Sequence, residues 1–317
     1  MDVVLNVVLT AAGIVMLCFG GHWLVGGGIS VARRFGISPM VIGITIVAMG
    51  TSTPELAASL AAGDNGEIIL GNVVGSNIAN IGMVIGVAAI MAPLIIKKGS
   101  LRIEIPVMIG FSVLLVALSV GGEISHLEGA VLVVLLIAFT AYMYRSSRKK
   151  AAKIEGTPAD KTVPKSVLLI GAGVALLGIG AILTIDNAEA LAQSFGVSDR
   201  YIGLTVIAIG TSLPELITSV IAIRRGYTDI GIGNIIGSNI YNILMIVGIS
   251  ATLSGIVVAQ QVFADYVVMI AFSMVMLVGL RMGRIGKTVG IGLLAGYLIY
   301  QFLTGIGAGI GYECCPL

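Results

Sequence analysis

The composition of this 317-residue chain excludes an ordinary soluble domain. Hydrophobic residues make up 57% of it and charged residues 11%, whereas about a quarter of the residues in a soluble domain are charged. The net charge is only +2 and the mean hydropathy is +1.07. Apolar stretches of roughly 18 residues or more, each long enough to cross a bilayer, recur along the chain. The sequence therefore predicts a polytopic membrane protein.

Ten membrane spans are expected in chain order. They cover residues 3–32, 38–63, 67–94, 103–121, 127–145, 166–196, 199–223, 229–256, 264–281 and 287–304. With these spans, seventeen of the eighteen Lys and Arg residues fall on one side and only Arg200 on the other. The positive-inside rule makes the basic side cytoplasmic. We therefore expect a multi-pass protein of the cell membrane with both termini extracellular.

The second expected span carries a polar run in its middle. Residues 41–49 read as lipid-buried helix, and Gly-Thr-Ser-Thr-Pro-Glu follows at 50–55. Pro54 would break the helix and free carbonyl groups of the preceding turn, near Ala48. Glu55 would then lie in the first turn of a new half-helix, whose dipole favours a carboxylate. Such a break, with hydroxyls at Thr51 and Ser52, favours a bound cation.

The third expected span contains the motif GNVVGSNIAN, residues 71–80. Ser76 and Asn80 are four residues apart and share one helical face. Gly71 and Gly75 permit close contact with another helix. Taken alone, these polar residues are equally well explained as interhelical hydrogen-bonding groups.

The second half of the chain repeats the first. GISPMVIGITIVAMGTSTPELAAS from Gly36 matches GVSDRYIGLTVIAIGTSLPELITS from Gly196, and GNVVGSNIANIGMVIG from Gly71 matches GNIIGSNIYNILMIVG from Gly233. Each half has five spans, an odd number, so the halves cross the membrane in opposite senses, as in many secondary transporters. The expected parts are residues 1–145, a basic cytoplasmic linker at 146–165, and residues 166–317.

These observations predict an all-α membrane protein of ten transmembrane helices, arranged as two inverted-topology repeats of five. Broken helices 2, 3, 7 and 8 are expected to form its core. Glu55 and Glu215 lie near the centres of spans 2 and 7, and a carboxylate at that depth normally marks a functional site. Because no Lys or Arg lies deep in any expected span, each Glu must be protonated or face a cation.

The candidate ligands are all oxygens. They are the side chains of Glu55, Glu215, Thr51, Thr211, Ser52, Ser212, Ser76, Ser238, Asn80 and Asn242, with the carbonyls of Ala48 and Ala208. Such a set, without His or Cys, suits Ca²⁺, Mg²⁺ or Na⁺ better than Zn²⁺ or Cu⁺. Two carboxylates neutralise one Ca²⁺, and a partly flexible cage favours Ca²⁺ over Mg²⁺.

GTSTPE and GTSLPE, each followed by GNxxGSN, resemble the alpha repeats of the cation/Ca²⁺ antiporter superfamily and are most similar to those of prokaryotic sodium/calcium exchangers. The resemblance implies Na⁺-driven Ca²⁺ antiport by alternating access, with Na⁺ and Ca²⁺ as transported ions, no cofactor and no nucleic-acid partner; a monomer is expected. The long first and sixth spans would slide to switch access, with the glycines that follow Gly20 and Gly171 providing a smooth surface.

The resemblance also implies four sites in a diamond between the halves. A central Ca²⁺ site would use Glu55, Glu215, Thr51 and Thr211. An outer Na⁺ site would use Glu55, Ser76, Ser212 and the Ala208 carbonyl, and an inner Na⁺ site Glu215, Ser52, Ser238 and the Ala48 carbonyl. Asn80 and Asn242 would flank the middle position. Some relatives have Asp in place of Asn242, which changes the charge expected there.

Three other functions share some of these sequence features or must be compared with them. An H⁺/Ca²⁺ exchanger is the closest, because a carboxyl group can carry a proton, although that branch usually has GN-x-x-E in place of GTS-x-PE. A cation channel would share acidic pore residues but would not need an inverted repeat. An enzyme is not expected, because no nucleophile with a His partner lies in the expected membrane core.

Overall fold

The computed structural model describes residues 3–96, 101–151, 162–195 and 208–310. In this part of the chain, seven helices are long and apolar enough to cross a membrane: Val3–Phe35, Pro39–Ala61, Gly66–Met91, His126–Ser147, Val163–Ser194, Thr228–Ser254 and Val262–Met282. The expectation of a helical membrane protein is confirmed, and the count of ten spans stays a prediction. The first residues of the expected seventh span, and residues 152–161 of the linker, lie outside the described residues.

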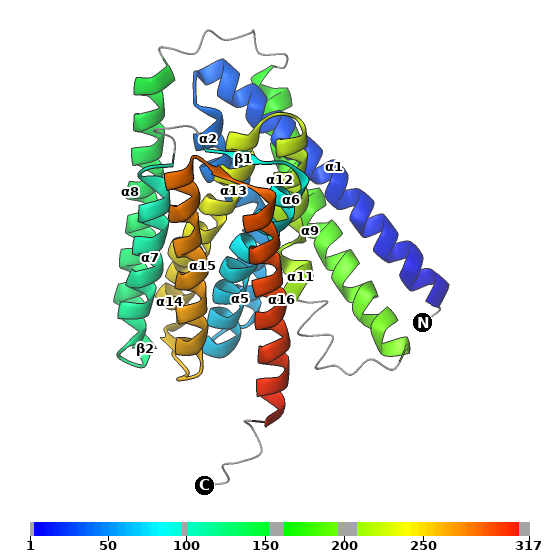
Figure 1. Ribbon diagram of the computed structural model, residues 1–317, viewed down its shortest axis with the longest axis vertical. Helices are drawn as coiled ribbons and strands as arrows, with labels where there is room; N and C mark the ends of the chain where they lie inside the picture. Colours follow the sequence, from blue (N-terminus) through cyan, green and yellow to red (C-terminus); the bar gives the residue numbers. More distant parts are fainter. Residues whose placement is uncertain (1–2, 97–100, 152–161, 196–207, 311–317) are drawn as a thin grey trace.

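Two long helices, α1 (Val3–Phe35) and α9 (Val163–Ser194), lie side by side and splay from the rest of the molecule (Figure 1). Glycines bring their backbones together: a Cβ on Gly20 would lie 2.9 Å from the Gly173 carbonyl oxygen, and one on Gly180 would lie 2.9 Å from the Gly13 carbonyl oxygen. Gly20 and Gly173 thus lie where α1 and α9 contact each other, and the expected sliding of these helices on a smooth glycine surface stays a prediction.

The second expected span is interrupted at Ser52. It consists of α2 (Pro39–Ile42), the π-helix η1 (Gly43–Val47), α3 (Ala48–Thr51) and α4 (Thr53–Ala61). Its counterpart is α11 (Ala208–Thr211) and α12 (Leu213–Arg224), interrupted at Ser212. The two serines have nearly the same backbone angles, φ −84° and ψ 3° at Ser52 and φ −91° and ψ 4° at Ser212.

The third and eighth expected spans are continuous, which corrects the expectation that they are broken. The third runs through α5 (Gly66–Ala79), the π-helix η2 (Asn80–Ile85) and α6 (Gly86–Met91); the eighth runs through α13 (Thr228–Tyr241), the π-helix η4 (Asn242–Val247) and α14 (Gly248–Ser254). Neither span contains a proline that would break it. Each instead has a π-helical segment, which widens the helix locally without ending it. Asn80 and Asn242 open the π-helices.

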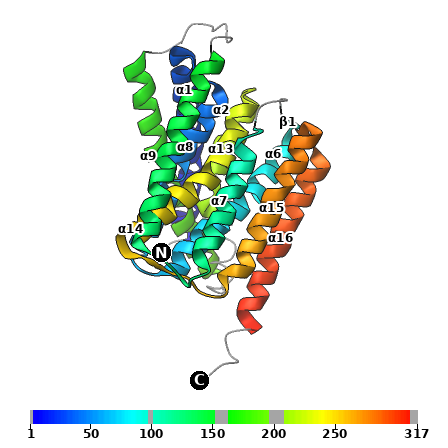
Figure 2. The same cartoon turned by 90° about the vertical axis from the view of Figure 1, so that its left-hand side faces the viewer.

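The eighth span occupies the centre of the molecule. The apolar window of Thr228–Ser254 is 100% buried by other parts of the protein, against 22% for Val3–Phe35. Helices α7 (Glu104–Ser119) and α8 (His126–Ala151) pack against it, while α15 (Val262–Met282) and α16 (Lys287–Ile310) pack against the third span. Figure 2 shows α15 and α16 together on the side away from α1 and α9.

Two short antiparallel strand pairs join the halves. Strand β1 (Leu94–Ile95) pairs with β4 (Arg284–Ile285), and β2 (Glu123–Ile124) pairs with β3 (Ile256–Val257). Each pair links a connection of the first half with a connection of the second. The pairs therefore tie the outer helices of both halves around the core.

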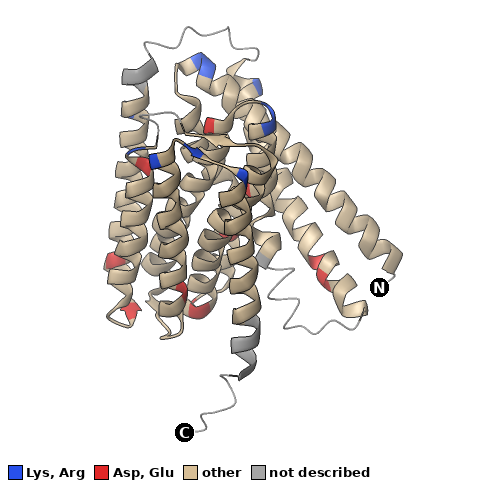
Figure 3. Ribbon diagram, viewed as in Figure 1, with Lys and Arg blue, Asp and Glu red and all other residues tan. Residues whose placement is uncertain are grey.

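The charges separate along the long axis. Lys and Arg gather where α1 ends and α16 begins, and Asp and Glu gather mostly at the opposite end (Figure 3). We call these the basic end and the acidic end. Arg33, Arg224 and Arg284 lie at the basic end, and Glu123 lies at the acidic end.

Candidate cation-binding site

The structure brings the two intramembrane carboxylates together. Glu55 lies in the first turn of α4, and Glu215 lies in the first turn of α12. Their side chains are 2% and 0% exposed, and they are close enough for a direct electrostatic interaction with each other. No Lys or Arg of the described residues is paired with either carboxyl group. Two buried acids without a basic partner form a site that attracts a cation.

Hydroxyl groups from both halves surround Glu215. Ser52 Oγ and Ser238 Oγ each donate to Glu215 Oε1 over 3.4 Å. Thr51 Oγ1 lies 3.3 Å from Ser238 Oγ, and it also reaches the Asn234 Oδ1 atom at 3.1 Å. Hydroxyl–carboxylate hydrogen bonds are usually 2.5–2.7 Å long. The longer distances here mean that these oxygens are held loosely around the carboxylate.

Several buried oxygens have no hydrogen-bond partner in the described part of the chain. Six of them belong to side chains singled out in the sequence: Glu55 Oε2, Ser76 Oγ, Asn80 Oδ1, Ser212 Oγ, Glu215 Oε2 and Asn242 Oδ1. A buried polar atom left unpaired costs about 1–3 kcal/mol. Because all six can donate a lone pair to a hard cation, they fit Na⁺ or Ca²⁺.

Any ion here would depend mainly on neutral oxygens. Within the described ranges there is no group of three or more His, Cys, Asp or Glu side chains that could hold a metal. The two carboxylates supply the charge, and hydroxyl and amide oxygens complete the shell. Such a mixed shell is typical of hard-cation sites in which some ligands are neutral.

Four asparagines form a reciprocal amide cluster between α5–η2 and α13–η4. Asn77 Nδ2 donates to the Asn239 carbonyl over 3.3 Å, and Asn239 Nδ2 donates to the Asn77 carbonyl over 3.4 Å. Asn80 Nδ2 donates to Asn239 Oδ1, and Asn242 Nδ2 donates to Asn77 Oδ1, both over 3.0 Å. The amide nitrogens of Asn80 and Asn242 are thus fixed, which leaves their oxygens as acceptors.

Asn77 and Asn239 were not among the candidates from the sequence. The sequence contained a pattern that could have identified them. Each follows the candidate serine in the GSN motif and lies three residues before the candidate asparagine. On a helix, residues three apart are neighbours. The amides that meet across the pseudo-symmetric interface become evident only once the two helices are placed together.

Two further asparagines brace the carboxylate-bearing helices. Asn72 Nδ2 donates to the Glu55 carbonyl over 3.1 Å and to Ser59 Oγ over 2.9 Å. In the second half, Asn234 Nδ2 donates to Ser219 Oγ over 3.0 Å. These bonds tie α5 to α4 and α13 to α12, one from each GN dipeptide. They are contacts that the sequence analysis missed.

The remaining candidates differ between the halves. The Ala48 carbonyl accepts hydrogen bonds from Ser52 N over 2.9 Å and from Thr51 Oγ1 over 3.2 Å, so it is not the freed carbonyl that was expected. Ala208 is the first described residue of α11. Thr51 is buried, whereas Thr211 is partly exposed.

Comparison with known proteins places this geometry in a wider group. A family model described as "Sodium/calcium exchanger protein" matches residues 5–145 and 165–305. The inner membrane protein YrbG of Escherichia coli is 33% identical over 308 residues, covering 92% of this chain and 94% of YrbG. The sodium/calcium exchanger MaX1 of Methanosarcina acetivorans is 32% identical over 345 residues, covering 94% and 98%. The solved structure of the sodium-calcium exchanger NCX_Mj superposes with a TM-score of 0.83 at 31% identity, covering 96% of this chain and 100% of that one.

Proposed function

The chain belongs to the sodium/calcium exchanger family, and from this premise we propose that it is an antiporter that exchanges Na⁺ for Ca²⁺ by alternating access. The observation that carries the proposal is the set of six buried oxygens without a hydrogen-bond partner in the described part of the chain, which includes one carboxylate oxygen each of Glu55 and Glu215. Both carboxylates come from opposite halves of the chain. Ions of either kind would need the same two charges.

Competition for these charges gives the coupling. Two carboxylates neutralise one Ca²⁺ or two Na⁺, so an excess of bound Na⁺ weakens the attraction for Ca²⁺. The attraction between a carboxylate and Na⁺ at 4 Å is worth about 4 kcal/mol at an effective dielectric constant of about 20, and that between a carboxylate and Ca²⁺ is about twice as large. Removing the net negative charge with Na⁺ therefore lowers Ca²⁺ affinity steeply, and a Na⁺ gradient can drive Ca²⁺ release.

We assign the ligands as follows. The central Ca²⁺ site uses Glu55, Glu215, Thr51 and Thr211. The outer Na⁺ site uses Glu55, Ser76, Ser212 and the Ala208 carbonyl, and the inner Na⁺ site uses Glu215, Ser52, Ser238 and the Ala48 carbonyl. Asn80 and Asn242 flank the middle position. For Ala48 to coordinate, the Thr51 hydroxyl would turn from that carbonyl, which would then keep its bond from Ser52 N and have one lone pair for the ion.

The coupling ion is tested in vesicles containing the purified chain. We expect Ca²⁺ uptake to follow an outward Na⁺ gradient imposed at constant pH on both sides. The matched arm imposes a proton gradient of equal size without Na⁺. Uptake that ignores Na⁺ and follows protons would replace the proposal with H⁺/Ca²⁺ exchange.

The same vesicles distinguish a channel from an exchanger by the Ca²⁺ flux measured without a counter-ion. An exchanger moves little Ca²⁺ when no counter-ion is present on the other side. Passive Ca²⁺ current under those conditions, without a Na⁺ or proton gradient, would overturn the antiport proposal.

A further inference from the structure

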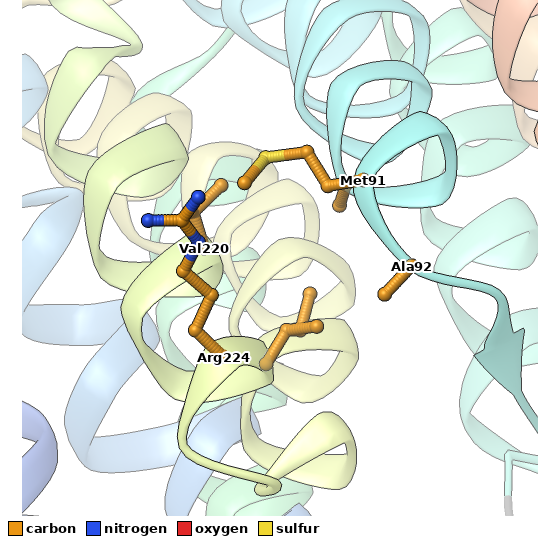
Figure 4. Close-up of a pocket in the computed structure, with 6 residues that line it drawn as sticks. Met91, Ala92, Val220 and Arg224 are labelled. Carbon is orange, nitrogen blue, oxygen red and sulfur yellow. The ribbon is translucent and has the colours of Figure 1, made fainter.

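A groove opens between α6 and α12 at the basic end. It encloses about 260 Å³ and is lined by Ala88, Met91, Ala92, Val220, Ile223 and Arg224. Figure 4 shows that the Arg224 side chain runs back along α12, so that its guanidinium lies beside Val220 and faces Met91 of α6. Five apolar side chains line the groove, and the exposed Arg224 supplies its single cationic group.

This lining is unsuited to Na⁺ or Ca²⁺. None of its side chains carries a carboxylate, hydroxyl or amide oxygen, and the guanidinium repels cations. Among the described residues, Arg224 has no hydrogen-bond or ion-pair partner. Arg224 is exposed, so its charge lies at the edge of the apolar lining, which suits a ligand that is anionic at one point and apolar elsewhere.

The inverted repeat shows that the charge belongs to this end of the protein. At the offset of 160 residues, Val220 corresponds to Leu60, and Arg224 corresponds to Asp64. The first position of the pair is apolar in both halves, whereas the second is acidic in the first half and basic in the second. The guanidinium is thus specific to the basic end, and positive groups close to an anionic leaflet attract its lipids.

We propose that the groove binds one anionic phospholipid, with the headgroup phosphate on Arg224 and an acyl chain against Met91 and Val220. Arg is suited to the phosphate because its fork of donors matches two phosphate oxygens. The helix that supplies Arg224 also carries Glu215 in its first turn. The bound lipid thus contacts the helix that holds one of the two site carboxylates.

The binding is tested by native mass spectrometry of the full chain in detergent. The protein is titrated with dioleoyl phosphatidylglycerol and, separately, with dioleoyl phosphatidylcholine. We expect preferential retention of phosphatidylglycerol, and Arg224→Gln should weaken that retention about five-fold. Arg284→Gln removes the same charge from the same end at an exposed position of β4 that is not among the residues lining this groove, and it should leave retention nearly unchanged.

Two further arms keep the test decisive. Val220→Phe keeps the charge and fills the groove, so it should also reduce retention of phosphatidylglycerol. Soluble glycerol 3-phosphate, which has a phosphate but no chain, should not displace the lipid. Equal loss in Arg224→Gln and Arg284→Gln, or full displacement by glycerol 3-phosphate, would overturn a lipid site. Because retention is measured without transport, the result is independent of the exchange proposal.

Discussion

At the residue scale, the site combines two like charges with oxygens that lack partners. Glu55 and Glu215 repel each other when both are ionised, and burial in a low dielectric strengthens that repulsion. Hydroxyl donors such as Ser52 and Ser238 stabilise the charge only in part, because their contacts with Glu215 are 3.4 Å long. A bound cation removes the repulsion and satisfies the unpaired oxygens at once.

We expect Glu55→Gln and Glu215→Gln each to abolish Na⁺-driven Ca²⁺ uptake. Glutamine keeps the shape but removes one unit charge, whose attraction for a divalent ion at 4 Å is about 8 kcal/mol at an effective dielectric constant of about 20, so Ca²⁺ affinity should fall by more than roughly 1,000-fold. Uptake of radioactive Ca²⁺ into vesicles measures the effect. Glu67→Gln, an exposed position in the first turn of α5, is the control and should transport normally. Near-normal uptake in either site variant would refute the assignment.

The asparagine cluster makes a separate prediction about stability. Asn77→Ala leaves the Asn242 amide nitrogen without its acceptor, and Asn239→Ala leaves the Asn80 amide nitrogen without its acceptor. Each variant should lose about 1–3 kcal/mol, seen as a lower thermal midpoint in detergent. Because each side chain donates to the other residue's backbone carbonyl, which alanine keeps, the two variants remove different hydrogen bonds and their losses should nearly add. A double variant that loses much less than the sum would contradict independent bonds.

Much of this site could be predicted from residue type, while its contacts could not. Glu55 and Glu215 stand out in the sequence because a carboxylate in an apolar span is energetically costly and usually functional. The two residues also occupy equivalent positions in the two repeats. Asn77 and Asn239 escaped because their meeting depends on how α5 and α13 cross. The serine breaks follow from proline, whereas the π-helices at Asn80 and Asn242 have no proline signal and were expected as breaks.

At the element scale, the glycines of α1 and α9 act in pairs. Gly20 faces Gly173 and Gly13 faces Gly180, which brings the two helix backbones into contact along much of their length. Gly21 instead faces Thr218 of α12. Close backbone packing through small residues is how membrane helices associate. The pair α1–α9 is therefore joined as one unit, with a separate face toward the core.

Two glycines of α9 provide a matched test of this packing. A Cβ on Gly173 would lie 2.7 Å from the Leu24 backbone nitrogen, whereas one on Gly171 would meet nothing within 4 Å. Gly173→Ala should therefore separate the helices and lower both the thermal midpoint and the exchange rate. Gly171→Ala should be neutral or stabilise by up to about 1 kcal/mol, since alanine is the better helix former. Equal behaviour of the two variants would contradict the packing role.

At the scale of the whole molecule, the apolar core divides in two. The larger cluster surrounds α5, α13 and the outer helices, while a smaller one, including Leu17, Leu24 and Leu177, lies where α1 and α9 meet α2, η1 and α12. The β1–β4 and β2–β3 pairs fasten the outer helices of both halves together. This division is what we expect if, as proposed, the α1–α9 unit moves against a fastened body.

The separation of charge along the long axis predicts the orientation of this body. Because basic connections stay on the cytoplasmic side, the end with β1 and β4 should face the cytoplasm and the end with β2 and β3 should face outward. In a background with Cys18, Cys314 and Cys315 changed to Ser, single cysteines are placed by Glu123→Cys or Arg284→Cys, both exposed positions.

A membrane-impermeant maleimide applied to intact cells should label Glu123→Cys at once and Arg284→Cys only after permeabilisation. The two positions lie in equivalent strand pairs at opposite ends, so a difference in labelling reports the side of the membrane and not the local structure. The reverse pattern would place the basic end outside. It would also put the proposed phospholipid groove in the outer leaflet, where the positive-inside argument for an anionic ligand no longer holds.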